Sequence, residues 1–212
     1  MLFSDVTATA FLATYGYWAI AGTVGLESVG IPLPGETILI AAAAWAGAAH
    51  QLNIVWVIIA AAAGAIVGDS IGFWIGRNLG LSLLKRYGGH VGLSAPRLKL
   101  GRYLFMRHGG KVVFFGRFVS LLRTLAALFA GANRMHWPRF LVFNASGGIV
   151  WATAYGLSAY YAAKLLKQIS GPISLGLLVL GMIGVIAGFV FLRRHEQGLI
   201  ANAEQALPGP LE

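Results

Sequence analysis

Five charged side chains lie inside or at the edge of long apolar stretches: Glu27, Glu36, Asp69, Arg117 and Arg123. At the centre of a membrane helix each charge costs about 2.5–3.5 kcal/mol, so the five together could cost on the order of 10–15 kcal/mol. Charges at membrane depth pair with one another or mark the path of an ion or a charged substrate. The sequence therefore predicts a polar site inside a membrane, built from acids and arginines.

The two arginines are candidate ligands of a phosphate group. Arginine stays charged when it is buried, and its planar guanidinium matches the oxygens of a phosphate. On an unbroken helix Arg117 and Arg123 would point about 240° apart, so a break near Ser120 is needed for both to face one ligand. The alternative is that they only form ion pairs with Glu27 and Glu36, which would hold the structure together.

The acids are candidate proton carriers. A carboxylate whose arginine partner turns to an incoming phosphate could take up a proton, which would couple phosphate binding to proton transfer. Static salt bridges are the alternative for Glu27 and Glu36, and Asp69 could equally serve as a hydrogen-bonding group of a hairpin. The histidines show no spacing of metal ligands, so we expect neither a metal ion nor a cofactor.

The composition is that of a membrane protein, because 58% of the 212 residues are hydrophobic and only 11% are charged. The net charge of +9 would suggest nucleic acid as the partner of a soluble protein. Here the basic residues concentrate between Arg77 and Lys111, flanked by apolar stretches, so we expect an anionic lipid surface and no nucleic acid. The chain has no cysteine, and Met1–Asp5 lacks the basic start of a cleavable signal peptide.

The apolar stretches predict an all-α membrane protein with about four transmembrane helices and two re-entrant, broken-helix hairpins. The four expected spans are 6–26, 54–76, 140–163 and 172–192. The first hairpin is expected from Glu27 to about Gly47, with Pro32, Pro34 and Gly35 as its hinge, because irregular backbone at membrane depth must be buried or line a cavity. The second is expected within 112–130, with its hinge near Ser120.

Four glycines at four-residue spacing lie in the second expected span: Gly64, Gly68, Gly72 and Gly76. They would form a smooth stripe on which another helix packs closely. Each half of the chain thus pairs an interrupted, charged hairpin with a glycine-bearing span. Interrupted hydrophobic segments in corresponding positions indicate an inverted-repeat transporter with its site at the midplane.

The chain is expected to form one membrane domain over 1–192, followed by a disordered cytoplasmic tail over 193–212. The basic linker over 77–111 is expected in the cytoplasm by the positive-inside rule, with a short helix over 96–106 on the membrane surface. Four spans would then place both termini inside. Lys164 and Lys167 would fall outside and count against this topology.

Several blocks of this sequence carry a family resemblance. They are Glu27 with Pro32-Leu-Pro34-Gly35-Glu36; Gly68-Asp69-Ser-Ile-Gly72-Phe-Trp-Ile-Gly76-Arg77; Phe115-Gly-Arg117-Phe118 with Arg123; and Gly131, Met135, Phe140, Asn144, Gly147 and Trp151. Together they resemble the DedA family, also called the SNARE-associated or VTT-domain family, over roughly 26–151. One departure is Ser120, which stands where the family usually has a proline.

The resemblance implies lipid transport. DedA proteins are bacterial inner-membrane proteins linked to the proton-motive force and the cell envelope, and members are described as moving undecaprenyl phosphate or phospholipids such as phosphatidylethanolamine. The residues that match the family's functional positions are Glu27, Glu36, Arg117 and Arg123. The expected partners are therefore a phosphate-bearing lipid, protons and the bilayer, and a homo-oligomer is left open. The alternatives are an integral-membrane phosphatase acting on such lipids and a non-transporting membrane protein.

Overall fold

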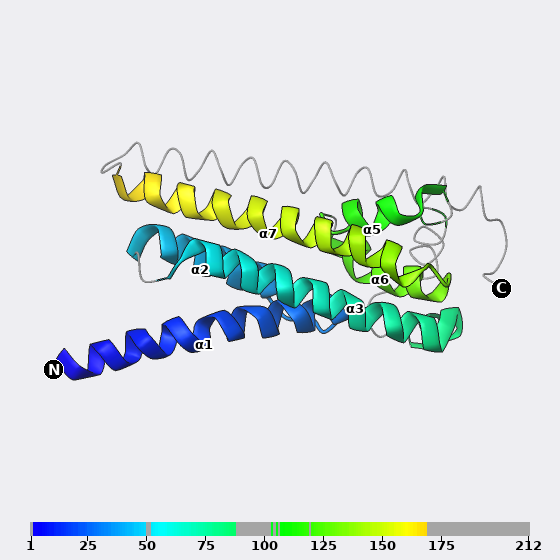
Figure 1. Cartoon of the computed structure of the whole chain (residues 1–212), viewed down its shortest axis with the longest axis horizontal. Helices are drawn as coiled ribbons and strands as arrows, with labels where there is room; N and C mark the ends of the chain where they lie inside the picture. Colours follow the sequence, from blue (N-terminus) through cyan, green and yellow to red (C-terminus); the bar gives the residue numbers. More distant parts are fainter. Residues whose placement is uncertain are drawn as a thin grey trace.

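The computed structural model describes residues 2–49, 52–87, 103, 105, 107–118 and 120–168. Within these residues all regular structure is helical, which confirms the all-α prediction. The helices are α1 (Leu2–Val29), α2 (Gly35–Ala49), α3 (Ile54–Tyr87), α5 (Gly110–Gly116), α6 (Ser120–Ala132) and α7 (Trp137–Gln168). Figure 1 shows α3 and α7 running the length of the molecule, with the shorter helices beside them.

The first hairpin joins α1 to α2, and the end of α1 explains the reversal. Gly30 follows α1 with φ +116°, and the N–H of Ile31 donates to the carbonyl oxygen of Leu26 (3.1 Å). This is the bond of a Schellman motif, in which glycine is favoured because an L side chain is strained at positive φ. Residues 31–34, which include both predicted hinge prolines, are non-helical, and α2 begins at Gly35.

The predicted glycine stripe of α3 packs against two helices in succession. A Cβ at Gly64 would overlap the carbonyl oxygen of Ala21, and one at Gly68 would overlap another carbonyl of α1. Further along, a Cβ at Gly76 would overlap the carbonyl oxygen of Leu128 in α6. Small residues allow such backbone-to-backbone approach. Both α1 and α6 therefore lie along one side of α3.

Gly72 is the loosest position of this stripe. A Cβ there would meet only the Cβ of Ala127 at 3.5 Å, which is an ordinary contact. At this level the close approach depends on a glycine of α6 instead, because a Cβ at Gly131 of α6 would overlap the carbonyl oxygen of Phe73 in α3. The four glycines of the stripe are thus not equivalent.

The second hairpin joins α5 to α6. α5 lies along α7, where a Cβ at Gly147 would reach the backbone of Phe114 at 3.3 Å. The chain turns at Arg117 and Phe118, and α6 begins at Ser120. The first helical residue is where proline is best tolerated, because its missing N–H would have no intrahelical partner. The break therefore persists here without the family's proline.

The two hairpins approach from opposite ends and meet beside the middle of α3 (Figure 1). In each hairpin the first helix packs along the next long helix of the chain, α1 on α3 and α5 on α7. The second helix of each packs along the other long helix, α2 on α7 and α6 on α3. The two halves of the chain thus make corresponding helix contacts, while α3 and α7 run in opposite directions. This is the arrangement that an inverted repeat predicts.

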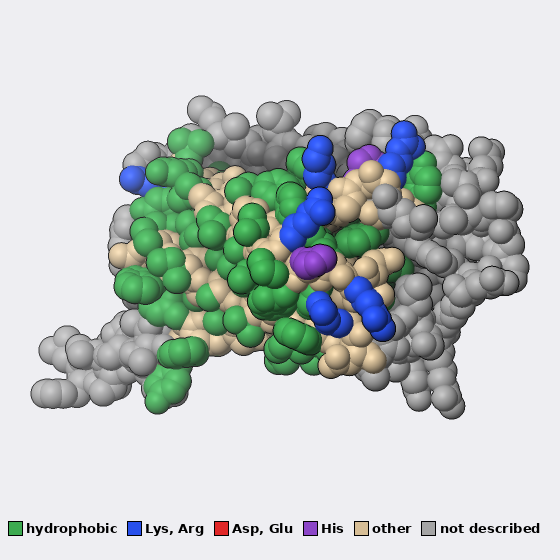
Figure 2. Space-filling model, turned by 45° about the vertical axis from the view of Figure 1, so that its right-hand side comes forward, with side chains coloured by type: hydrophobic (Ala, Val, Ile, Leu, Met, Phe, Trp, Pro, Cys, Tyr) green, Lys and Arg blue, Asp and Glu red, His purple; other side chains and the backbone are tan. Residues whose placement is uncertain are grey.

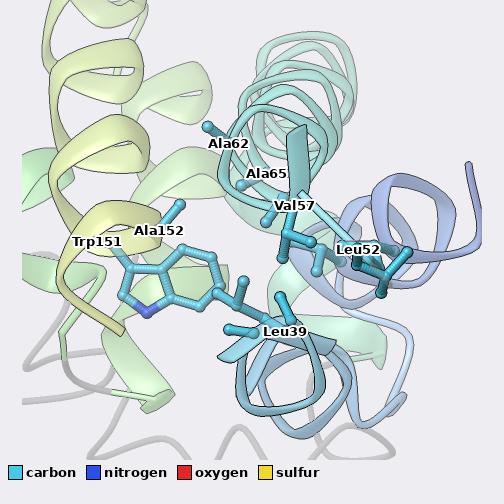
Figure 3. Packing of buried hydrophobic residues seen from close by; sticks show 12 residues of the cluster. Leu39, Leu52, Val57, Ala62, Ala65, Trp151 and Ala152 are labelled. Atoms are coloured by element: carbon cyan, nitrogen blue, oxygen red, sulfur yellow. The ribbon is translucent and has the colours of Figure 1, made fainter. Parts of the chain in front are cut away.

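Each hairpin has its own apolar core. One core lies under α1 and α2 and includes Leu39, Val57, Ala65 and Trp151, whose side chains converge between α2, α3 and α7 (Figure 3). The other lies under α5 and α6 and is built around Phe73, Phe129 and Phe140. The rings of Phe73 and Phe140 are stacked, with centroids 4.4 Å apart. The charged residues lie between these two cores.

The structure changes one part of the predicted layout. The expected span 6–26 is not separate from the first hairpin, because α1 continues through Glu27 to Val29 and is itself one arm of that hairpin. Among the described residues, two helical segments are long and apolar enough to cross a membrane, Ile54–Asn78 and Trp137–Lys167. The expected span 172–192, the tail 193–212 and most of the helix 96–106 lie outside the described residues.

The direction of α1 also bears on the predicted topology. α1 runs beside α3 in the same direction, so its Leu2 end lies on the same side of the molecule as Ile54, whereas α3 ends at Tyr87 on the opposite side (Figure 1). A membrane crossed by α3 separates these two ends. The expected cytoplasmic position of both the N-terminus and the linker assumes that 6–26 is a complete crossing, and it stays a prediction.

Candidate functional site

Arg123 lies at the meeting point of the hairpins and contacts both acids of the first hairpin. It occupies the first turn of α6. Its Nη2 lies 2.6 Å from Oε1 of Glu27, and its Nη1 lies 3.9 Å from Oε2 of Glu36. The structure thus brings the acidic and basic hairpins together, and the turn over 30–34 is what lets Glu27 and Glu36 face one guanidinium.

Glu27 has a second role as a cap of the neighbouring helix. Its Oε2 accepts a hydrogen bond from the backbone N–H of Glu36 (3.1 Å), in the first turn of α2. A carboxylate is favourable there because the first N–H groups of a helix lack intrahelical partners. Gly35 permits the approach, since a Cβ at Gly35 would lie 2.9 Å from the Cα of Val24. Glu27 is therefore held by two partners.

Glu36 is held less firmly. Its side chain is 39% exposed, against 17% for Glu27 and 6% for Arg123, and its separation from Arg123 is at the limit of an ion pair. Arg123 also lies over the ring of Trp151, with its guanidinium carbon 5.6 Å from the ring centroid, and its Nε has no hydrogen-bond partner. Arg123 can therefore exchange an interaction on the Glu36 side.

Arg117 forms a different, fully buried cluster. Its Nη2 pairs with Oδ2 of Asp69 in α3 and donates to Oδ1 of Asn144 in α7 (2.5 Å). The amide nitrogen of Asn144 in turn donates to the carbonyl oxygen of Ile66 (3.1 Å). Both Asp69 and Arg117 are buried. This cluster ties the turn of the second hairpin to the two long helices.

Some buried polar atoms of this cluster have no partner. They are Oδ1 of Asp69 and Nε and Nη1 of Arg117. Burying such atoms without hydrogen bonds costs free energy, and native structures usually satisfy them with a protein group or an ordered water molecule.

The structure therefore divides the predicted charges into two groups. The alternative to a phosphate site is that both arginines form ion pairs with Glu27 and Glu36, and of the two the structure shows such contacts for Arg123 alone. Arg117 pairs instead with Asp69, which the sequence singled out without a partner. Asn144, which the sequence offers only as one of the residues that carry the family resemblance, hydrogen-bonds Arg117.

Trp151, one of the residues that carry the family resemblance, lies under the guanidinium of Arg123. The sequence contains a pattern that could have indicated this contact, because Asn144, Gly148 and Trp151 are spaced to share one face of α7. A Cβ at Gly148 would lie 3.6 Å from the guanidinium carbon of Arg117. That face of α7 therefore contacts both arginines.

The described residues include no group of three or more His, Cys, Asp or Glu side chains that could share a metal ion. His108 and His136 are exposed, whereas His50, His90 and His195 lie outside the described residues.

Comparison with known sequences identifies the family. The VTT domain matches residues 33–161, which is more than half of the chain and includes Glu36, both arginines and the α7 residues that contact them. This chain belongs to the DedA family of VTT-domain membrane proteins. DedA-family membership accords with the helical hairpins and with the two apolar helices that are long enough to cross a membrane.

Relatives of this DedA-family chain match it along nearly its whole length. An uncharacterized membrane protein of Synechocystis is 39% identical over 200 residues, which is 91% of each chain. Protein DedA of Escherichia coli K12 is 26% identical over 211 residues, or 96% of this chain and 95% of that protein. A Lactococcus lactis protein named alkaline phosphatase-like is 28% identical over 193 residues, or 85% and 88%. No solved structure matches this chain.

Proposed function

We propose that this DedA-family protein is a flippase that moves a phosphate-bearing lipid across the bacterial inner membrane. The observation that carries the proposal is Arg123, a buried arginine between two hairpins that approach from opposite ends. With the membrane placed across α3 and α7, both hairpins would be re-entrant and Arg123 would lie near the midplane. A charge so placed usually serves a charged substrate or an ion. Undecaprenyl phosphate and phosphatidylethanolamine are the proposed lipids.

The proposed phosphate contact is Arg123, at its weakly held side. Glu36 lies 3.9 Å away and is partly exposed, so a lipid phosphate could replace it without breaking the 2.6 Å contact to Glu27. Arg123 is in the first turn of α6, where the helix dipole also favours an anion. The apolar tail of the lipid would stay in the bilayer while the headgroup passes between the hairpins.

Protons are proposed to enter through the acids that Arg123 releases. A carboxylate in a poorly solvated site is unfavourable as an anion once its cation has turned elsewhere, so proton uptake would follow phosphate binding. Glu36 suits this role best because its contact is the longer one. Asp69 is a weaker candidate than the sequence suggested, because it is fully enclosed with Arg117. A phosphate-binding role for Arg117 stays a prediction.

The proposed orientation keeps the basic linker in the cytoplasm. The linker carries the largest concentration of Lys and Arg in the chain, and such segments stay on the cytoplasmic side. The Leu2 end of α1 would then lie on the opposite side.

Transport can be tested with purified protein in vesicles that contain a fluorescent phosphate-bearing lipid, using a membrane-impermeant quencher to report movement between leaflets. Arg123→Lys should slow translocation because lysine keeps the charge but loses the planar fork, and Arg123→Ala should slow it further. Arg139→Lys is the matched control, since Arg139 is exposed in the first turn of α7. Equal rates for Arg123→Lys and wild type would contradict the proposed phosphate contact.

The role of protons is tested in the same vesicles at two pH values. Glu27→Gln and Glu36→Gln mimic the protonated acids, so they should spare lipid binding and remove the pH dependence of transport. If both variants respond to pH as wild type does, the carboxylates are structural and proton coupling is wrong.

A lipid phosphatase is the second candidate, favoured by the name of the Lactococcus lactis relative. Release of inorganic phosphate from the same lipid, measured alongside translocation, separates the two. Phosphate release without translocation would favour the phosphatase, and neither activity with any headgroup would favour a non-transporting membrane protein.

A further inference from the structure

Six exposed basic residues gather at the end of the molecule where α7 begins, and we refer to them as the basic surface: Arg107, His108, Lys111, Arg134, His136 and Arg139. They come from two parts of the sequence, the start of α5 and the connection from α6 into α7. These parts are in contact, because a Cβ at Gly110 would overlap the ring of Phe143 and lie 3.1 Å from the methyl group of Met135.

No acid balances the basic surface within the described side chains. The acids among them are Glu27, Glu36 and Asp69, and all three lie at the meeting point of the hairpins. Figure 2 shows Lys, Arg and His side chains close together on one face, with no Asp or Glu visible beside them. The charge of this surface therefore remains available to an external anion.

Local stability does not explain two of these cations, Arg134 and Arg139. Arg139 lies in the first turn of α7, where the positive end of the helix dipole disfavours a cation. Arg134 has φ +53°, a conformation in which glycine or asparagine is usual. An anion bound from outside would offset the repulsion at Arg139, which supports a binding role over a structural one.

The neighbours of the basic surface indicate which anion. Exposed apolar side chains lie next to it, including Phe115 of α5 and Val142 of α7. Arg77 lies over the rings of Phe73 and Trp74, with its guanidinium carbon 6.0 and 5.7 Å from their centroids. Aromatic rings and cations next to an apolar exterior are typical of the headgroup level of a bilayer.

We propose that the basic surface binds the headgroups of anionic phospholipids in the leaflet at this end of the molecule. This goes beyond translocation, since the bound lipids would surround the protein and need not move. It also extends the expected lipid contact from the linker to Arg134, His136 and Arg139, which the sequence places after the second hairpin. The occupant is an anionic lipid because a charged headgroup and an apolar tail together match both the cations and their surroundings.

Detergent-solubilised, full-length protein can be titrated with phosphatidylglycerol or with phosphatidylcholine while its thermal unfolding is followed. Each basic residue near an anionic lipid surface should contribute about fivefold to binding. The double variant Lys111→Gln, Arg139→Gln should therefore raise the apparent Kd for phosphatidylglycerol by roughly 25-fold and leave the response to phosphatidylcholine unchanged. Lys164→Gln is the control, because Lys164 is exposed near the other end of α7.

Three results would overturn the proposal: equal stabilisation of wild type by both lipids, an unchanged Kd in the double variant, or an equal loss in Lys164→Gln. Arg139→Lys should keep the affinity, since the attraction depends on charge. If the double variant does not fold, wild type decides the matter, because 1 M salt should abolish its preference for phosphatidylglycerol by screening. Arg123→Lys should keep that preference even where transport is lost, which separates this surface from the proposed transport site.

Discussion

Replacing Asp69 by asparagine should destabilise this protein far more than replacing Glu36 by glutamine. Asp69 and Arg117 are both buried, and removing one partner of a buried ion pair costs about 3–5 kcal/mol because the other charge is left uncompensated. Glu36 lies 3.9 Å from Arg123 and is 39% exposed, so its pair should contribute only about 0–1 kcal/mol. For a chain of this size Asp69→Asn should lower the unfolding midpoint by roughly 10 °C.

A double variant makes this prediction sharper. Asp69→Leu combined with Arg117→Met removes both charges and keeps apolar volume, and such replacements are often neutral or stabilising. The double variant should therefore recover part of the stability that Asp69→Asn loses, as measured by thermal unfolding in one detergent; the recovery is not complete because Oδ1 of the buried Asn144 loses its donor. Equal midpoints for Asp69→Asn and Glu36→Gln, or no recovery in the double variant, would refute the reasoning.

Lipid translocation by the same purified variants then tests what Arg117 does. If its only task is to hold the turn of the second hairpin against Asp69 and Asn144, the stable double variant should still translocate lipid. If Arg117 contacts the phosphate directly, the double variant should be stable and inactive.

Two further comparisons test the backbone. Gly72→Ala should be neutral or stabilise the protein by up to about 1 kcal/mol, because alanine favours the helix and has room there. Gly76→Ala should destabilise it by about 1–3 kcal/mol through overpacking. Equal thermal unfolding midpoints for these two variants would contradict the packing described. Gly30→Ala should cost about 1–2 kcal/mol at its positive φ, and Arg134→Gly should raise the midpoint by relieving the same kind of strain. A lower midpoint for Arg134→Gly would show that its side chain stabilises the protein.

The charged site residues could be found from the sequence, because charges within apolar stretches are costly. Which acid pairs with which arginine could not be found in this way. Glu27 and Glu36 were expected to converge through a turn at the prolines, and they do. The partner of Arg117 depends on how α3 and α7 are placed around the second hairpin. Asp69 is 48 residues away from Arg117, and no local pattern relates the two.

The hairpin arms show a second limit of sequence reading. The apolar stretch 6–26 is long enough to cross a membrane, so hydropathy alone cannot distinguish a complete crossing from one arm of a hairpin. The decisive feature is Gly30, which ends α1 just past the level of Gly68. The glycine stripe was correctly predicted to pack, but four-residue spacing does not reveal that α1 and α6 share it or that Gly72 is loose.

The separation of 48 positions between Asp69 and Arg117 also has a consequence for synthesis. At a synthesis rate of about 5–20 residues per second, Asp69 of α3 leaves the ribosome several seconds before Arg117, its partner, has been synthesised. During that interval α3 must enter the bilayer with an uncompensated charge, at a cost of about 2.5–3.5 kcal/mol. Its own apolar residues have to outweigh this cost, and Ile54–Asn78 is indeed the more apolar of the two candidate spans. α7 follows when its buried partners are already in place, so it can tolerate more polar side chains, including Asn144.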